Sequence, residues 1–153
     1  MKVGKEGVFG AIAALGHRMR LDVKAWEADQ DRKMHLIMDR LGTVEGISLS
    51  VDRDPNGNPF SRARVTVHPE RIGLTAAAIS QAMTDDEPSI RLRAHHVDEG
   101  YFTVDAMEMS DEEVDLACDR MIGLMTAPDS VKTGLMAKYG GGRAVDAMFS
   151  WLE

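Results

Sequence analysis

The amino-acid sequence predicts a two-layer α/β (α+β) sandwich, in which helices cover one face of a mainly antiparallel sheet of about four strands. Apolar residues recur every three or four positions near both ends of the chain, which is the spacing of a helix face. In the middle, apolar and polar residues alternate in short stretches separated by turn-forming residues, as in paired strands. At 153 residues the chain is long enough for one domain with a sizeable core.

Residues 1–42 are expected to form two connecting helices that lead into the domain. The first helix carries one apolar stripe, made of Val8, Ile12, Leu15 and Met19. Asp22 can cap the start of the second helix with its carboxylate, and Gly42 is a suitable residue to end it.

The small α/β domain is expected to span residues 43–127 and to contain two β-hairpins. Residues 47–52 and 62–68 alternate on either side of a Pro-Asn-Gly turn, and residues 90–96 and 101–105 alternate around an acidic turn that ends in glycine. If the four strands share one sheet, its apolar face collects Ile47, Leu49, Val51, Ala63, Val65, Val67, Ile90, Leu92, Phe102 and Val104. The opposite face collects Ser48, Ser50, Arg62, Arg64, Thr66, Arg91, Arg93, His95, Tyr101 and Thr103.

Two further helices are expected within this domain. Thr75 can cap a short, alanine-rich helix that runs to about Met83. Ser110 and Glu113 have the spacing of a capping box, in which each side chain satisfies a backbone N–H at the start of a helix. The second of these is the strongest helix start in the chain.

Residues 128–153 are expected to form a helical C-terminal extension. Pro128 closes the preceding helix, and three consecutive glycines separate two short helical pieces at residues 130–139 and 143–152. The glycines lack the preceding strand of a phosphate-binding loop, so they indicate a hinge.

The composition indicates a cytoplasmic protein. No apolar run approaches the length of a membrane span, and a formal net charge of −7 disfavours nucleic acid, so we expect neither a membrane nor a nucleic-acid partner. The single cysteine, Cys118, cannot form an internal disulfide, and its place in a helical apolar stripe indicates a buried side chain rather than a nucleophile.

The polar face of the predicted sheet carries the candidate chemistry. Arg91 and Arg93 share that face, and a guanidinium binds a carboxylate or a phosphate through two parallel hydrogen bonds. A polar face that is simply solvated remains the alternative. Neighbouring residues of a strand point to opposite faces, so His95 and His96 are not expected to share a metal ion, and no metal site is predicted.

Five short segments, in this order, resemble pyridoxal-phosphate-dependent enzymes of fold type I related to D-glucosaminate-6-phosphate ammonia-lyase and bacterial selenocysteine synthase. The segments are Met1-Lys2-Val3-Gly4-Lys5-Glu6, Arg71-Ile72-Gly73-Leu74-Thr75, Glu87-Pro88-Ser89-Ile90-Arg91-Leu92-Arg93, Phe102-Thr103-Val104-Asp105 and Asp111-Glu112-Glu113. The resemblance covers roughly residues 1–125 and implies the fold of the small C-terminal domain of such an enzyme.

The resemblance implies a function that this chain does not complete alone. The lysine that binds pyridoxal phosphate in the family would precede Met1, so the cofactor is expected in the complete enzyme and not on this chain, and no catalytic or cofactor-binding residue is assigned. Small domains of this fold contribute an arginine to the substrate carboxylate, for which Arg93 is the first choice and Arg91 the second. The implied substrate is an anionic amino acid or amino sugar acid. The expected partners are a large cofactor-binding domain, upstream or on a separate chain, and further copies in a homo-oligomer. A non-catalytic protein-binding or assembly module is the alternative.

Overall fold

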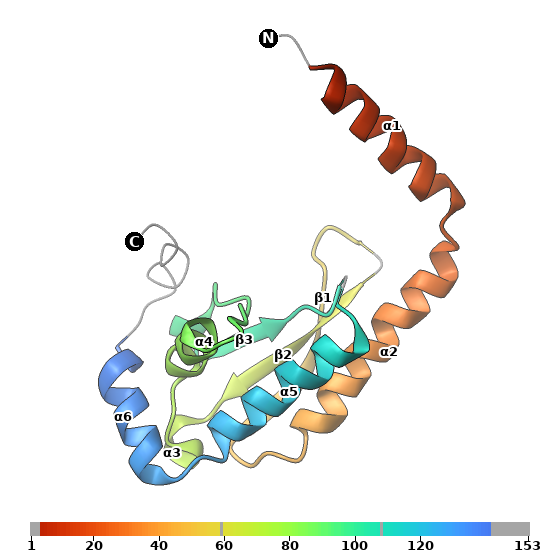
Figure 1. Ribbon diagram of the computed structural model, residues 1–153. Coiled ribbons are helices and arrows are strands. Elements are labelled where there is room, and N and C mark those ends of the chain that lie inside the picture. The colour runs from red at the N-terminus through yellow and green to blue at the C-terminus, as the bar shows by residue number, and fades with distance from the viewer. Residues whose placement is uncertain (1–3, 59, 108, 142–153) are drawn as a thin grey trace.

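The computed structural model describes residues 4–58, 60–107 and 109–141, and its elements follow one another as a mixture of helices and strands (Figure 1). In chain order they are α1 (Lys5–Arg20), α2 (Val23–Leu41), β1 (Ile47–Arg53), β2 (Ser61–Val67), α3 (Pro69–Ile72), α4 (Ala76–Asp85), the 3-10 turn η1 (Val97–Glu99), β3 (Tyr101–Val104), α5 (Asp111–Met125) and α6 (Asp129–Tyr139). The two-layer combination of helices and an antiparallel sheet is therefore confirmed, although within the described residues the sheet has three strands.

The sheet is antiparallel with the strand order β1-β2-β3. Leu49 pairs with Val65, and Val65 pairs with Phe102, so apolar side chains from all three strands meet on one face. Helices α2, α4 and α5 lie on that face (Figure 1), where Phe102 and Val65 are completely buried. The hairpin between β1 and β2 forms where the turn chemistry predicts it, with Gly57 in the left-handed region at φ +75°.

The prediction of a fourth strand at residues 90–96 is wrong. In this segment only Arg93 pairs with the sheet, through a single bridge to Thr103 with N···O distances of 3.0 and 3.2 Å. The chain enters the segment held to the end of α4, because the Ile90 amide donates to the Met83 carbonyl at 2.9 Å. It leaves through η1, so the pairing cannot extend beyond one bridge.

The predicted division of the sheet into an apolar and an exposed polar face is only partly correct. Val51, expected in the core, is 45% exposed because it lies near the open end of β1. In the opposite sense, Arg62, Tyr101 and Thr103 belong to the polar face and are nevertheless buried. The polar face thus contains a packed cluster of polar side chains, rather than a uniformly solvated surface.

The predicted helix starts are confirmed. Asp22 accepts a hydrogen bond from the Ala25 amide at 3.1 Å, and Thr75 accepts one from Ala78 at 3.1 Å. Ser110 and Glu113 form the complete capping box at the start of α5. Each of these caps joins residues three positions apart, which explains why the sequence alone reveals them.

Long-range ion pairs join α2 to α5 on the surface above the core. Arg32 donates to Asp111 at 2.6 Å, and Arg40 donates to both Asp115 and Asp119. Beneath them, apolar residues of the two helices complete the core, with Ile37 and Leu41 on α2 and Val114, Cys118 and Met121 on α5. The two helices therefore hold each other as well as the sheet.

The first of the two tail helices expected in residues 128–153 is present as α6, whereas residues 143–152 lie outside the described residues. The hydroxyl of Tyr139 donates to Asp85 at the end of α4 at 2.6 Å, and Lys138 lies 3.6 Å from the same carboxylate. Side-chain hydrogen bonds from Tyr139 and Gln81 lower the pKa of Asp85. These contacts attach α6 to α4.

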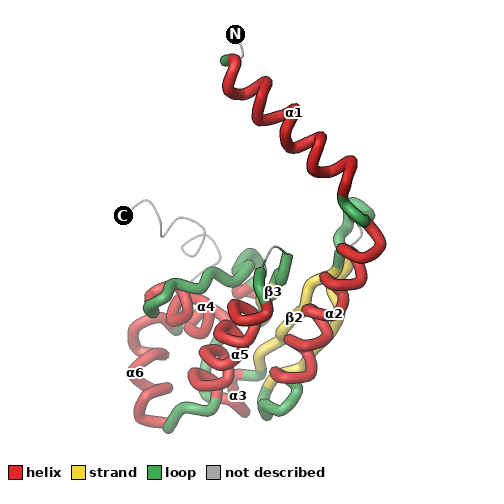
Figure 2. The backbone as a smooth tube through the Cα atoms, turned by 45° about the vertical axis from the view of Figure 1, so that its right-hand side comes forward, coloured by secondary structure: helices red, strands yellow, loops and turns green. Residues whose placement is uncertain are grey.

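Helix α1 extends away from the sheet beyond the start of α2 and has no buried residue (Figures 1 and 2). Its predicted apolar stripe forms but is exposed, with Phe9 also 70% exposed beside it. The stripe is 48% exposed at Val8, 59% at Ile12, 63% at Leu15 and 87% at Met19. Among the described residues, no helix has the length and apolarity needed to cross a membrane.

Cys118 is expected to resist alkylation in the folded protein. The side chain is completely buried, and burial raises the pKa of its thiol to about 11. At pH 8 only about one thiol in a thousand would then be ionised, and the thiolate is the reactive form. Iodoacetamide labelling followed by mass spectrometry should be slow in buffer and fast in denaturant. Native labelling at the rate of a free cysteine would contradict this burial.

Candidate functional site

The polar face of the sheet contains a cavity of about 540 Å³. Its lining combines the end of β1, the strands β2 and β3, and the segment that bridges to β3. The lining residues are Asp52, Arg53, Pro55, Arg62, Arg93, His95, His96, Tyr101 and Thr103. In a chain with a net charge of −7, this concentration of arginine and histidine is a local exception that suits an anionic ligand.

Arg62 forms the fixed, structural part of this cavity. Its Nε donates to Asp105 at 2.9 Å and its Nη1 to Asp54 at 3.4 Å, so one buried guanidinium connects two carboxylates. Although burial opposes ionisation, hydrogen bonds from Asn58, Asn56 and Arg62 hold the pKa of Asp54 below its usual value. With its charge balanced by two carboxylates, Arg62 is better suited to supporting the cavity than to binding a ligand.

Arg93 is the more available arginine. Its backbone is held to Thr103 by the bridge, but its side chain is 48% exposed, and Nη1 lies 3.6 Å from an Asp105 oxygen that Arg62 already occupies. Arg91 is exposed and is not among the residues that line the cavity. Of the two arginines that the sequence suggests, the structure brings only Arg93 into the cavity.

Tyr101 lies at one end of the cavity between two planar groups. The guanidinium carbon of Arg64 is 3.5 Å from the centre of the Tyr101 ring, and the His96 ring stacks on Tyr101 at 4.8 Å with 10° between the planes. A guanidinium so close to the ring centre leaves no room for a parallel ring on the same side, so the two groups occupy opposite faces. The alternation of the predicted strands places Tyr101 and Arg64 on the polar face but predicts no role for either one.

The two histidines both line the cavity, contrary to the expectation that they point to opposite faces. That expectation is wrong because the residues lie where the chain turns into η1, not in a strand. His96 Nδ1 lies 2.8 Å from a carboxylate oxygen of Glu99, which fixes the orientation of its ring. Over the described ranges, no group of three or more histidine, cysteine or acidic side chains is placed to hold a metal ion.

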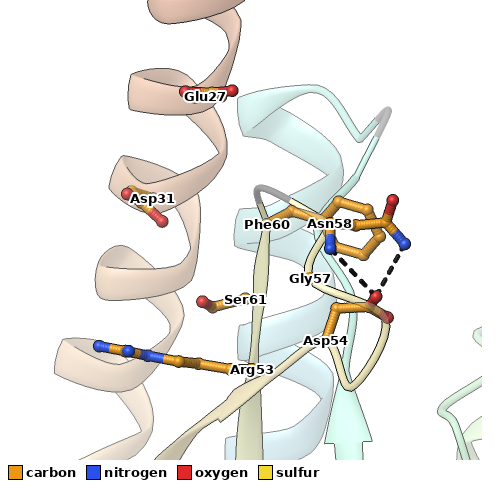
Figure 3. A pocket seen from close by; sticks show the side chains of 8 residues that line it. All are labelled: Glu27, Asp31, Arg53, Asp54, Gly57, Asn58, Phe60 and Ser61. Carbon is orange, nitrogen blue, oxygen red and sulfur yellow. Dashed lines mark hydrogen bonds between the residues drawn. The ribbon is translucent and has the colours of Figure 1, made fainter.

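A second cavity, of about 370 Å³, lies between α2 and the turn that joins β1 to β2 (Figure 3). Glu27 and Asp31 border it from α2, while Arg53 extends toward the same helix. Asp54 accepts hydrogen bonds from the backbone and side chain of Asn58 at 3.3 and 2.7 Å. This carboxylate is therefore engaged in shaping the turn.

The three-stranded antiparallel sheet with helices on one face also occurs as one part of a larger protein of known structure. A solved structure of D-glucosaminate-6-phosphate ammonia-lyase shares it with a TM-score of 0.66 and 22% sequence identity, over 82% of this chain and 33% of that chain. The resemblance to this ammonia-lyase expected from the sequence is thereby confirmed at the level of the fold.

Two curated proteins are similar in sequence. One is 5'-C-glycyluridine monooxygenase-decarboxylase from a Streptomyces species, 28% identical over 135 residues, which are 88% of this chain and 34% of that protein. The other is D-glucosaminate-6-phosphate ammonia lyase from Salmonella typhimurium, 24% identical over 123 residues, which are 79% of this chain and 32% of that protein. The chain spans about a third of the length of these relatives. No family model matches it.

Proposed function

We propose that this chain is the substrate-binding C-terminal portion of a larger pyridoxal-phosphate-dependent enzyme, resembling an ammonia-lyase or transferase, that acts on an anionic amino acid or amino sugar acid. The observation that carries the proposal is the position of Arg93, half exposed in a basic cavity of a fold shared with a third of an ammonia-lyase. The names of the two relatives denote an amino sugar acid phosphate and a uridine bearing a glycyl group. Both compounds carry an amino group.

Arg93 is proposed to bind the substrate carboxylate through paired hydrogen bonds from its guanidinium. Its present contact with Asp105, at 3.6 Å, is longer than a hydrogen bond, so a carboxylate ligand has little to displace. Asp105 and Arg62 hold each other at 2.9 Å and give this end of the cavity a rigid wall. Arg91, the second choice from the sequence, lies outside the cavity and has less support.

The residues of this chain do not fit pyridoxal phosphate as a complete site. The cofactor, when bound, supplies an electron sink for a carbanion, and such enzymes hold it on a lysine. No lysine is among the residues that line the polar-face cavity. We therefore assign the cofactor to a separate cofactor-binding body, either upstream or on another chain.

Helix α1 is proposed to attach this chain to that body. Its apolar stripe has no buried residue, and three glycines within the helix, Gly7, Gly10 and Gly16, lower its intrinsic stability. A helix of 16 residues with such a composition is marginal without a partner. About two-thirds of each relative has no counterpart in this chain, so a body of that size is available to cover the stripe.

The proposal predicts that the purified chain does not form a covalent complex with pyridoxal phosphate. Mixed with the cofactor, it should show no visible absorption band of a lysine-bound cofactor, because no lysine borders the cavity. Borohydride treatment followed by peptide mapping should find no single modified lysine. Co-expression with the cofactor-binding body should produce the band. A stable adduct on one specific lysine of this chain would sink the proposal.

A non-catalytic assembly module is the second candidate, and the exposed stripe on α1 favours it. In that case α1 joins copies of the chain in a homo-oligomer or docks another protein, and the cavity has no substrate. An assembly module should form a defined oligomer that Leu15→Glu dissociates, which light scattering measures, and should show no cofactor-dependent activity in any complex. Cofactor-dependent activity in the co-expressed complex would instead support the enzyme. Either candidate is consistent with the cytoplasmic location that we propose from composition.

A further inference from the structure

We propose that the stack of Arg64, Tyr101 and His96 binds a planar heterocycle of the nucleobase class, which forms the end of the substrate remote from its carboxylate. This inference rests on the proposed function, because it assigns the second half of the cavity in which Arg93 holds the carboxylate. The remote end of the substrate is therefore proposed to be a planar ring rather than a phosphoryl group.

The stack already consists of three flat groups placed one above another. Tyr101 is only 8% exposed and contacts Arg64 on one face and His96 on the other. The outermost member, His96, has a side chain that is 49% exposed and borders the cavity. A flat ligand ring can therefore lie against the imidazole and continue the stack, an interaction that tolerates many ring types because every base has a π face.

The stack lies at a suitable distance from Arg93. Thr103 is bridged to Arg93 and Tyr101 is stacked with His96, and these two positions of β3 are separated by one residue. Their side chains share the polar face, and two residues of strand cover roughly 7 Å. A substrate with a carboxylate at Arg93 and several bonds to a ring can reach the stack without a change in the sheet.

The local charge disfavours a phosphoryl group at this end. A carboxylate oxygen of Glu99 lies 2.8 Å from Nδ1 of His96. A dianion at His96 would be repelled by this carboxylate, whereas an uncharged ring would not. The Glu99 contact also fixes the imidazole plane, which reduces the entropy lost when a ring stacks on it.

The test is a titration of the full chain, without cofactor, followed by the NMR signals of the backbone and of the histidine rings. The probes are uridine, ribose, which lacks the ring, and 6-phosphogluconate, which has a phosphoryl group but no planar ring. Uridine is expected to shift the ring signals of His96 upfield through ring currents, to change the neighbouring backbone signals of Tyr101, and to bind more tightly than the other two. Binding of 6-phosphogluconate but not uridine to these residues would overturn the inference.

Three variants show whether His96 acts through its flat ring. His96→Gln should weaken uridine binding by roughly tenfold, the scale of one stacked base, whereas His96→Tyr, which keeps a ring, should largely restore it. Arg91→Gln, an exposed change outside the cavity, is the matched control and should leave uridine binding unchanged. Equal uridine binding in the protein with His96→Gln, or no uridine binding at the solubility limit, contradicts the inference.

The results of the uridine titrations can be distinguished from success or failure of the proposed function. Ring stacking on His96 requires no cofactor, so it can be present even if the chain never joins a cofactor-binding body. Conversely, cofactor-dependent activity on a phosphorylated amino sugar acid, with no effect of His96→Gln on KM, would support the proposed function and reject the planar ring.

Discussion

Replacing Arg93 with glutamine is expected to lower kcat/KM about a thousandfold in the enzyme complete with its cofactor-binding body. Removing one member of a charged, hydrogen-bonded pair typically costs about 2–5 kcal/mol, and glutamine is polar but is shorter than arginine and lacks its charge and its fork of donors. Steady-state kinetics measure the loss. Arg93→Lys should recover a part of it, because a lysine keeps the charge but not the paired geometry.

Arg91→Gln is the control for this prediction. Arg91 lies two residues earlier in the same segment, is exposed, and does not line the cavity. Its replacement should leave kcat/KM within about threefold, since surface changes away from a site have small effects. Equal losses in the two variants would assign the anion-binding role to the segment as a whole. A full loss only with Arg91→Gln would reverse the assignment.

Replacing Arg62 with alanine is expected to lower the free energy of unfolding by about 3 kcal/mol, because it leaves two carboxylates without their shared cation in a partly buried place. The side chain of Arg62 is 9% exposed, and those of Asp54 and Asp105 are 7% and 19% exposed. Urea denaturation followed by circular dichroism measures the change, and the slope of the transition should stay constant.

Arg53→Ala is the matched control for Arg62→Ala, because Arg53 lies on the adjacent strand but is exposed. It should change the free energy of unfolding by less than about 0.5 kcal/mol. If both variants lose similar stability, the effect is general to arginine in this hairpin. A stable protein with Arg62→Ala would mean that water replaces the ion pairs at little cost.

The parts of the fold that depend on neighbouring residues could be predicted from the sequence. The caps at Asp22, Thr75 and Ser110 act across three residues, and the turn at Gly57 needs only local chemistry. The same residues serve in almost any tertiary setting. Helix starts and the first hairpin were therefore predictable without knowledge of the packing.

The segment at residues 90–96 shows where local information ends. Its alternation is that of a strand, and Ala94 is buried while Arg93 and His95 are exposed, as alternation predicts. Whether such a segment pairs along its length depends on where its ends are attached. Here the Met83 carbonyl holds one end and η1 diverts the other, and neither is visible in the alternation of apolar and polar residues.

In the candidate site, too, only the features that depend on neighbouring residues could be predicted from the sequence. Arg93 could be proposed from the chemistry of its side chain and its predicted face. Asp105, Arg64 and Tyr101 could not be given roles, because the pairing of Thr66 with Tyr101 and the contacts across the sheet depend on the strand register. The position of His96 in the cavity could not be predicted either, because it depends on the turn into η1. Alternation along residues 101–105 was the one signal that pointed toward Tyr101 and Asp105.

The ion pairs between α2 and α5 have a consequence for how the protein folds. Arg32 and Asp111 are 79 positions apart in the chain, so docking α5 on α2 closes a long loop. The hairpin of β1 and β2 can form from local contacts, and α2 and α4, which precede α5 in the chain, can cover part of its apolar face, but the core is incomplete until α5 arrives. During synthesis, a chain that has not yet extended past Met125 therefore leaves part of its core exposed, and this interval is when it is most exposed to aggregation.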